Sequence, residues 1–184
     1  MQLKFLNYLP LVALAAPAHA QSDAAKAFGS RPIIDVSISP DGKSLALVEP
    51  LVGRGSVVSV VRADGSAEPK PVLVSDGKED RLFGCAWSSN ARIVCNAYMI
   101  SLIYGERHGW TRMLAVDADG GEPKIVSARG SSDQLGFVLA GGDIIDWLGK
   151  DGEDTVLMDR YYLPETTTGK LNADQRKGLG VERV

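Results

Sequence analysis

The sequence predicts an all-β fold, a partial β-propeller of four-stranded antiparallel blades in which about two and a half blades are present. The first observation is a tight-turn motif, Ser-Pro-Asp-Gly-Lys at residues 39–43, between two apolar segments. Proline, aspartate and glycine are the residues that hairpin turns favour. The second observation is that similar turns recur, so that Asp41, Asn90 and Asp151 are 49 and 61 residues apart. Strand-built repeats of roughly 40–50 residues are typical of propeller blades.

The third observation comes from a different turn of the same repeat. Ala-Asp-Gly at residues 63–65 is followed by Glu-Pro-Lys at 68–70, and the same two motifs stand at residues 118–120 and 122–124. Asp64 and Asp119 are 55 residues apart. Two repeat patterns in the same phase indicate one repeated structural unit.

The first blade is expected at residues 31–76. Alternating apolar residues at 33–38 and a continuous apolar run at 44–49 predict its inner hairpin. Residues 57–61 predict a third strand, and residues 71–74 an outer strand, where nearby prolines are tolerated because one edge is free.

The second and third blades are expected at residues 80–128 and 143–184. In blade two we expect an inner hairpin, a long connecting loop and two further strands, at residues 82–87, 92–97, 99–109, 110–117 and 123–127. In blade three we expect strands at residues 144–148, 155–161 and 178–184. Because no outer strand follows, blade three is expected to be truncated and the chain to be the front part of a longer protein.

The first 20 residues resemble a signal peptide. Lys4 precedes an apolar stretch at residues 5–16, and Ala-His-Ala at 18–20 is a small-residue cleavage motif. The apolar stretch is short for a membrane span, although an uncleaved anchor is the alternative. We therefore expect export to the periplasm, no membrane span after cleavage, and a polar N-terminal arm at residues 21–30.

Composition excludes several classes of function. The formal net charge is −3, and no basic stripe is present that would indicate nucleic-acid binding. The turn aspartates stand singly, without the closely spaced oxygen ligands of a calcium loop, and no phosphate-binding glycine loop occurs. We expect neither a metal nor another cofactor.

Cys85 and Cys95 are candidates for a disulfide. If the first hairpin pairs Ser39 with Lys43, the second hairpin in the same register pairs Ser88 with Arg92 and places the cysteines opposite each other. That pair would be non-hydrogen-bonded, with Cα atoms about 4.5 Å apart, at the short edge of what a disulfide accepts. Export supplies an oxidising compartment. The alternative is two small buried thiols, and a turn shorter by one residue would point the side chains to opposite faces.

Aromatic and polar residues gather in the expected loop of blade two. Tyr104, Arg107 and His108 precede Trp110, so they are candidates for a rim that contacts substrate or a neighbouring domain. The alternative is an ordinary exposed loop that leads to a buried tryptophan. Trp87 and Trp147 occupy equivalent repeat positions, which predicts that both pack between blades.

These motifs resemble the propeller of the prolyl oligopeptidase family of serine peptidases and the related periplasmic TolB-type propellers. Three segments favour the exported dipeptidyl-aminopeptidase-like group: Phe-Gly-Cys-Ala-Trp-Ser at residues 83–88, Gly-Trp-Thr-Arg at 109–112, and Ile-Asp-Trp-Leu at 145–148. The resemblance covers residues 28–184. It implies a propeller that caps a C-terminal α/β-hydrolase domain and limits the access of peptides to it.

The resemblance supplies no catalytic residue in this chain. The family's hydrolase domain carries a Ser–Asp–His triad, but no serine here stands in a Gly-x-Ser-x-Gly motif. His108 is the sole histidine after the signal sequence. We therefore expect the chain to be inactive by itself and non-catalytic. The alternative is a non-enzymatic periplasmic propeller, of TolB or WD-repeat type, that acts as a protein-interaction module.

Overall fold

The computed structural model describes residues 33–128, 130, 134, 136–147, 154–163 and 178–184. The chain divides into two compact units, Met1–Ser30 and Arg31–Val184. The expected signal peptide and N-terminal arm, residues 1–20 and 21–30, lie outside the described residues, as does the turn at Asp151. All of the structure presented below belongs to the second unit.

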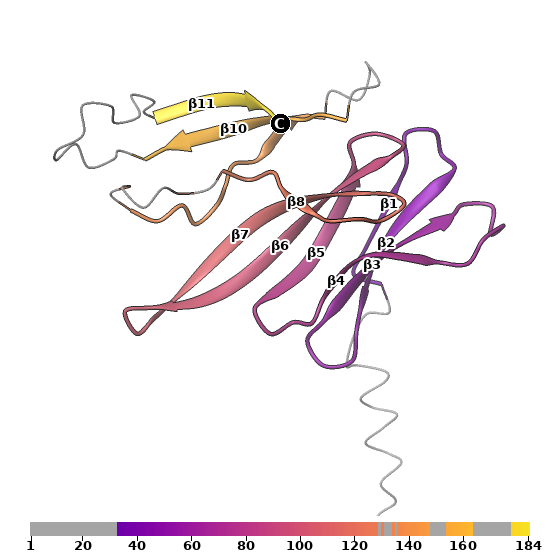
Figure 1. Cartoon of the computed structure of the whole chain (residues 1–184), viewed down its shortest axis with the longest axis horizontal. Coiled ribbons are helices and arrows are strands. Elements are labelled where there is room, and N and C mark those ends of the chain that lie inside the picture. The colour runs from indigo at the N-terminus through magenta and orange to yellow at the C-terminus, as the bar shows by residue number, and fades with distance from the viewer. Residues whose placement is uncertain (1–32, 129, 131–133, 135, 148–153, 164–177) are drawn as a thin grey trace, which may run out of the picture. The chain divides into compact units, whose positions relative to one another are not determined.

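The regular elements of the described residues are β-strands, which form three antiparallel sheets (Figure 1). Sheet one contains β1 (Asp35–Ile38), β2 (Ser44–Pro50), β3 (Ser56–Arg62) and β4 (Lys70–Ser75). Sheet two contains β5 (Asp80–Trp87), β6 (Arg92–Ile103), β7 (Glu106–Asp117) and β8 (Lys124–Ile125). Sheet three contains β9 (Ile144–Asp146), β10 (Leu157–Tyr162) and β11 (Gly178–Arg183). The all-β prediction is confirmed.

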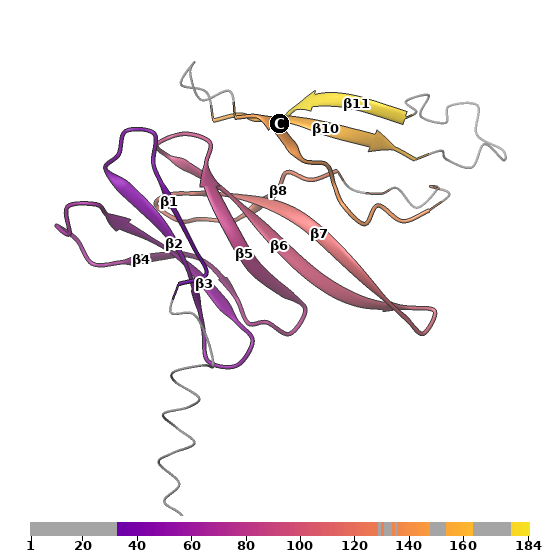
Figure 2. The ribbon, with the colours of Figure 1, turned by 180° about the vertical axis from the view of Figure 1, so that it is seen from behind.

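Each sheet is a meander, in which neighbouring strands are also consecutive in the chain. Seen from either side, sheets one and two are adjacent, and β10 and β11 form a separate layer beside sheet two (Figure 2). None of the three sheets closes on itself.

The first hairpin differs from its predicted register by one residue. The observed partners are Ile38 with Leu45, and the Ser39 N–H donates to the Ser44 carbonyl at 2.8 Å, so Ser39 does not pair with Lys43. The reason is the Asp41 carboxylate, which accepts the Lys43 N–H at 3.0 Å and holds Lys43 within the turn. The turn is therefore residues 40–43.

The prediction of a long loop at residues 99–109 is wrong. Strands β6 and β7 continue through it as a two-stranded ribbon that is paired as far as Ile103 and Glu106. Tyr104 and Gly105 close the ribbon, with φ of 52° and 84°. Positive φ at both central residues is the requirement of a tight I′ hairpin turn. The apolar run before Tyr104 is therefore strand.

The main core lies between sheets one and two. One face of sheet one carries Ala46, Val48 and Val58, all fully buried, because side chains alternate along each strand. They belong to one buried cluster with Ile93 and Val116 of sheet two. Val156 and Met158 of sheet three are buried as well but lie outside this cluster.

Hydrogen bonds also join sheets one and two at equivalent repeat positions. The Trp87 indole N–H donates to the Ser37 carbonyl at 3.2 Å, and the Asp41 N–H donates to Asn90 Oδ1 at 3.0 Å. The prediction that Trp87 packs between repeats is confirmed. Trp147 is different, because 37% of its surface is exposed.

Arg160 of β10 connects sheet three to the segment that follows sheet two. Its side chain is 3% exposed and donates to the carbonyls of Val126 and Gly141, both at 2.8 Å. It also forms a 2.7 Å ion pair with Glu182 of β11. A buried guanidinium needs such partners, since an unpaired one would be costly.

Candidate functional site

Hollows lined by the described residues lie along the side of sheet two that faces sheet three. The first, which we call the inner-strand pocket, has a volume of about 350 Å³. Its lining includes one residue from each first strand of the three sheets, Asp35, Gly84 and Ile144. Strands that are far apart in sequence therefore meet at one pocket.

The Asp35 carboxylate is held at this pocket by sheet two. Its Oδ2 accepts the backbone N–H of Cys85 at 2.9 Å. A Cβ atom at Gly84 would lie 3.4 Å from Asp35 Oδ2, which is an ordinary van der Waals contact. The carboxylate thus lies against β5, the edge strand of sheet two.

Asn96 and Asp143 complete the polar lining. Asn96 pairs with Gly84 on one side and with Met113 on the other, so its side chain shares their face of sheet two. Asp143 precedes β9, and its backbone N–H donates to Asp159 Oδ1 at 2.5 Å. The half-exposed Trp147 lines the same pocket from the other end of β9.

A second pocket, of about 240 Å³, shares Asn96, Met113 and Asp143 with the first. At its far end Arg112 donates to the carbonyls of Val138 and Leu139, at 2.8 and 3.1 Å. Burial lowers the pKa of the Arg112 guanidinium from its ordinary value. Arg112 is thus a positioned structural cation that fixes the edge of β7.

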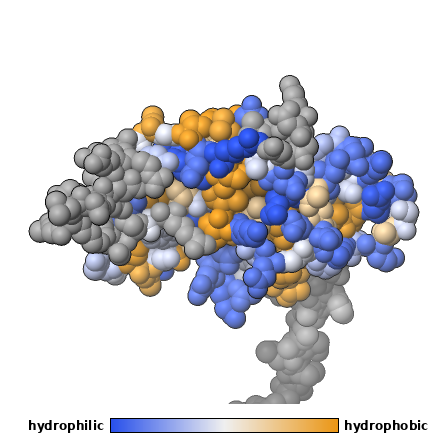
Figure 3. All heavy atoms as spheres, turned by 45° about the horizontal axis from the view of Figure 1, so that its top comes forward, coloured by the Kyte–Doolittle hydropathy of each residue, from blue (hydrophilic) through white to orange (hydrophobic). Residues whose placement is uncertain are grey.

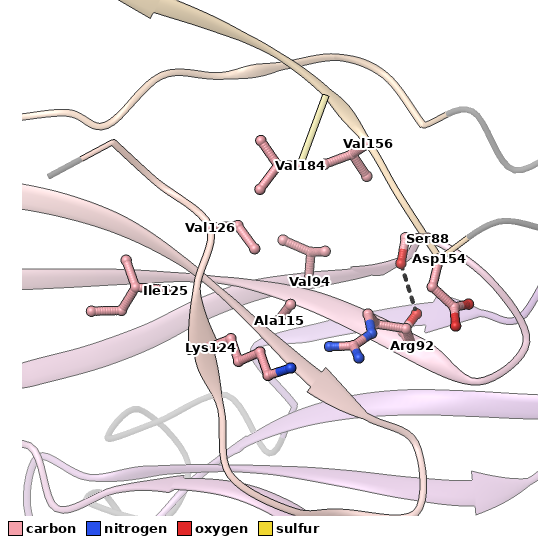
Figure 4. Close-up of a pocket in the computed structure, with 10 residues that line it drawn as sticks. All are labelled: Ser88, Arg92, Val94, Ala115, Lys124, Ile125, Val126, Asp154, Val156 and Val184. Carbon is pink, nitrogen blue, oxygen red and sulfur yellow. Dashed lines mark hydrogen bonds between the residues drawn. The ribbon is translucent and has the colours of Figure 1, made fainter. Parts of the chain in front are cut away.

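The third hollow, the valine pocket, is shown in Figure 4 and has a volume of about 280 Å³. Aliphatic side chains from both sheets line it, namely Val94, Val126, Val156 and Val184. Arg92 at its mouth is paired with Asp117 at 3.1 Å. Lys124 and Asp154 add one charge of each sign, so the mouth has no net charge.

The predicted rim residues are not brought together. Tyr104 is at the tip of the ribbon and is 96% exposed. Arg107 pairs with Leu102, whereas His108 pairs with Ser101 and therefore projects from the opposite face. The His108 ring packs on Phe137, with centroids 5.6 Å apart, and Trp110 packs on the same ring. None of these residues lines the three pockets.

Cys85 and Cys95 are direct partners in the register of β5 and β6. Their Cα atoms are 4.0 Å apart and their sulfurs are joined in a disulfide. Both side chains are buried in the core between sheets one and two. The bond thus lies on the opposite side of sheet two from Asn96.

The described residues contain no cluster of three or more histidine, cysteine or acidic side chains that could hold a metal ion. Asp35, Asn96 and Asp143 were not predicted as site residues. The sequence Ile-Ile-Asp at residues 33–35, where a carboxylate interrupts an apolar inner segment, is a signal for Asp35 alone. Its repeat at residues 144–146 points to Asp146, which does not line the pocket. No helix within the described ranges has the length and apolar character needed to span a membrane.

Searches against family models, curated proteins and solved structures found no match for this chain.

Proposed function

We propose that this chain is the propeller part of an exported serine peptidase of the prolyl oligopeptidase type. In this role it contributes no catalytic group and controls the access of peptides to a C-terminal α/β-hydrolase domain. The observation that supports the proposal is the sequence of three meander sheets whose first strands, β1, β5 and β9, line a common pocket. Inner strands that surround a central channel are the arrangement of a propeller.

The environment of His108 agrees with a non-catalytic role. The ring of His108 packs against Phe137, and none of the described side-chain hydrogen bonds joins it to a serine hydroxyl. The resemblance of the repeat motifs to the peptidase propellers is what supports the proposed family. Export to the periplasm is part of the same proposal and is supported by the leader-like sequence at residues 1–20.

The experiment has two parts. The coding sequence downstream of Val184 is read for a Gly-x-Ser-x-Gly motif, and the native protein is treated with a fluorophosphonate probe in periplasmic extracts. The proposal expects the motif and a labelled serine within it. The chain expressed alone should cleave neither aminoacyl-proline nor general peptide substrates. Labelling of a serine in residues 33–184 would overturn the non-catalytic role.

A non-enzymatic interaction module is the second candidate, and exposed apolar strands favour it. Leu179 of β11 is 82% exposed, and Val36 and Ile38 of β1 and Val181 of β11 are also exposed. Apolar surface between hydrophilic patches is visible on the face shown in Figure 3. Exposed apolar patches of this kind mark contact sites for other proteins. Absence of a hydrolase domain, together with co-purification of a stable partner, would favour this role.

A further inference from the structure

The valine pocket contains a buried hydrogen-bond donor to which the described residues supply no acceptor. Arg92 of β6 lines the pocket, and one of its terminal guanidinium nitrogens forms a 3.1 Å ion pair with Asp117 Oδ1. The Nε–H of the same guanidinium is buried and has no hydrogen-bond partner among the described residues. Because a buried donor without an acceptor is costly, this N–H indicates a place for a further acceptor.

A second cation faces the same space. Lys124 of β8 pairs with Ala115, and Ala115 pairs with Val94, so these three side chains form one row on the pocket face of sheet two. Arg92 is two residues before Val94 and lies in the next row of that face. In Figure 4 the charged ends of Arg92 and Lys124 point toward each other beside the aliphatic side chains.

The acidic residues of the mouth balance its charge but leave these donors open. Asp117 bonds to a terminal nitrogen of Arg92 and not to its Nε. Asp154 is exposed, and within the described ranges neither it nor Lys124 forms an ion pair. An added carboxylate between the two cations would therefore accept charge-assisted hydrogen bonds from both.

The walls of the pocket decide which kind of anion fits. Val156 and Val184 exchange two backbone hydrogen bonds, at 2.9 and 3.0 Å, so their side chains leave the same face of the strands and meet Val94 from the other sheet. A hydrated inorganic ion would gain nothing from aliphatic walls, whereas a hydrocarbon chain is removed from water there. The volume of about 280 Å³ is at the small end of ligand pockets and favours a short chain.

We infer that the valine pocket binds a short aliphatic carboxylate. The Arg92 Nε–H and the Lys124 ammonium group donate to the carboxylate, and the hydrocarbon chain lies between Val94 and Val156. The bound molecule would contact side chains on both sides of the junction between sheets two and three. A free aliphatic acid and the C-terminal residue of a peptide share this chemistry. The site would serve a peptidase or an interaction module equally, so the inference is independent of the proposed function.

The test titrates the full chain with sodium hexanoate and follows the valine methyl signals by NMR, assigned with single Val→Ile variants. The Val94 and Val156 signals should shift with saturation, whereas the signal of Val58, fully buried in sheet one, should not. Hexanol, which has the chain without the charge, should bind at least about tenfold more weakly. N-acetylvaline is the second probe: saturable binding would identify a peptide terminus as a source, and binding of hexanoate alone would identify a free acid.

The variants Arg92→Lys and Lys124→Gln should each weaken hexanoate binding about tenfold, because each removes one charge-assisted hydrogen bond. Lysine at position 92 retains a cation opposite Asp117, and Lys124 is exposed, so both variants should fold. An unchanged Val58 signal checks that they do. Lys70→Gln is the matched control, since Lys70 ends the same Glu-Pro-Lys motif in the first repeat and is also exposed. It should bind as the wild type does.

Three outcomes would overturn the inference. They are equal affinity for hexanol and hexanoate, unchanged affinity in both cation variants, or saturable shifts confined to valines outside the pocket. The first would indicate a purely apolar pocket, and the other two a different binding surface.

Discussion

The two junctions between neighbouring sheets are built differently, although the sheets share a repeated sequence pattern. Between sheets one and two, fully buried aliphatic side chains such as Val48 and Ile93 form a continuous core that also contains the disulfide. Between sheets two and three, the hollows remain open and a buried arginine supplies much of the connection. The first junction is therefore suited to stability, and the second to binding.

The equivalent tryptophans show the same difference. Trp87 is 7% exposed and donates its indole N–H to sheet one, while Trp147 is 37% exposed and lines the inner-strand pocket. A repeat position thus specifies the residue type but not its environment. The environment depends on how closely the next sheet packs.

The largest expected effect comes from removing a buried side chain at each junction. Ile93→Ala should lower the free energy of unfolding of sheets one and two by about 2–5 kcal/mol, because it leaves a cavity in a fully packed core. Met158→Ala in sheet three should cost less, since its strand partner Ile144 borders the inner-strand pocket and can relax into the space. Urea unfolding measures both variants. A larger loss for Met158→Ala would contradict the difference between the junctions.

The next effect concerns the arginine connection. Arg160→Met leaves the Val126 carbonyl without its side-chain donor, whereas the Gly141 carbonyl keeps the Ala128 N–H, and it also removes the ion pair with Glu182. The local stability of sheet three should fall by about 3 kcal/mol. Hydrogen exchange should accelerate at β10 and β11 but remain slow at β6. Arg107→Met, on the exposed ribbon of sheet two, is the control and should change exchange in sheet three little. Equal acceleration in sheet two would show that the sheets unfold together.

Replacing Cys85 and Cys95 together by alanine tests the covalent part of the first junction. The closed loop is short, with a sequence separation of 10, so the expected loss is about 2–3 kcal/mol. Denaturant unfolding of the double variant and of the wild type with reductant should agree. Mass spectrometry of unreduced, alkylated wild-type protein is the direct check, and two free thiols would contradict the bond.

The two tryptophans give a smaller, paired test. Trp87→Phe removes the donor to the Ser37 carbonyl and should cost about 1–2 kcal/mol. Trp147→Phe should change stability by less than about 0.5 kcal/mol, because that side chain is exposed beside a hollow. Both are measured by urea unfolding under identical conditions. Equal losses would mean that Trp147 packs as tightly as Trp87 in solution.

The sequence predicted much of the strand order because local patterns determine it. Alternating apolar residues and Asp-Gly turns correctly placed β2, β3 and β5 to within about two residues. The ribbon was missed because Tyr104 stands where asparagine or aspartate usually signals a I′ turn. Without asparagine or aspartate before Gly105, the sequence lacks the usual signal for the turn that joins the two long strands.

The register of the first hairpin depends on a side-chain contact within its turn, and the pocket depends on contacts between sheets that the local sequence does not contain. The Ser88 N–H donates to the Arg92 carbonyl around a turn at residues 89–91, so the second hairpin has the predicted register and the first does not. The pocket residues Asp35, Asn96 and Asp143 belong to different sheets or their flanks. They meet because the sheets stack, which no local pattern specifies.

The smallest effect is a pH dependence of stability at the turn between β1 and β2, which contacts Asn90 of the second repeat. The Asp41 carboxylate accepts the Ser39 hydroxyl and the Lys43 N–H, at 2.7 and 3.0 Å, and these bonds lower the pKa of Asp41. The group is fully exposed, so the change in stability should be small. A carboxyl whose pKa is lowered by folding stabilises the protein above its unfolded pKa of about 3.9. That contribution is lost as the pH falls through the lower folded value.

Asp41→Asn removes this titration but retains an oxygen that can accept the Lys43 N–H. The stability difference between wild type and variant should therefore be constant near neutral pH and shrink below about pH 4. Thermal melts across this range measure the difference, and the chemical shift of the Asp41 carboxyl carbon reports the pKa directly. A difference that stays constant down to about pH 2 would contradict the shift. Because Asn90 already occupies the matching place in the second repeat and bonds to the Asp41 N–H, the turn contact itself should survive the substitution.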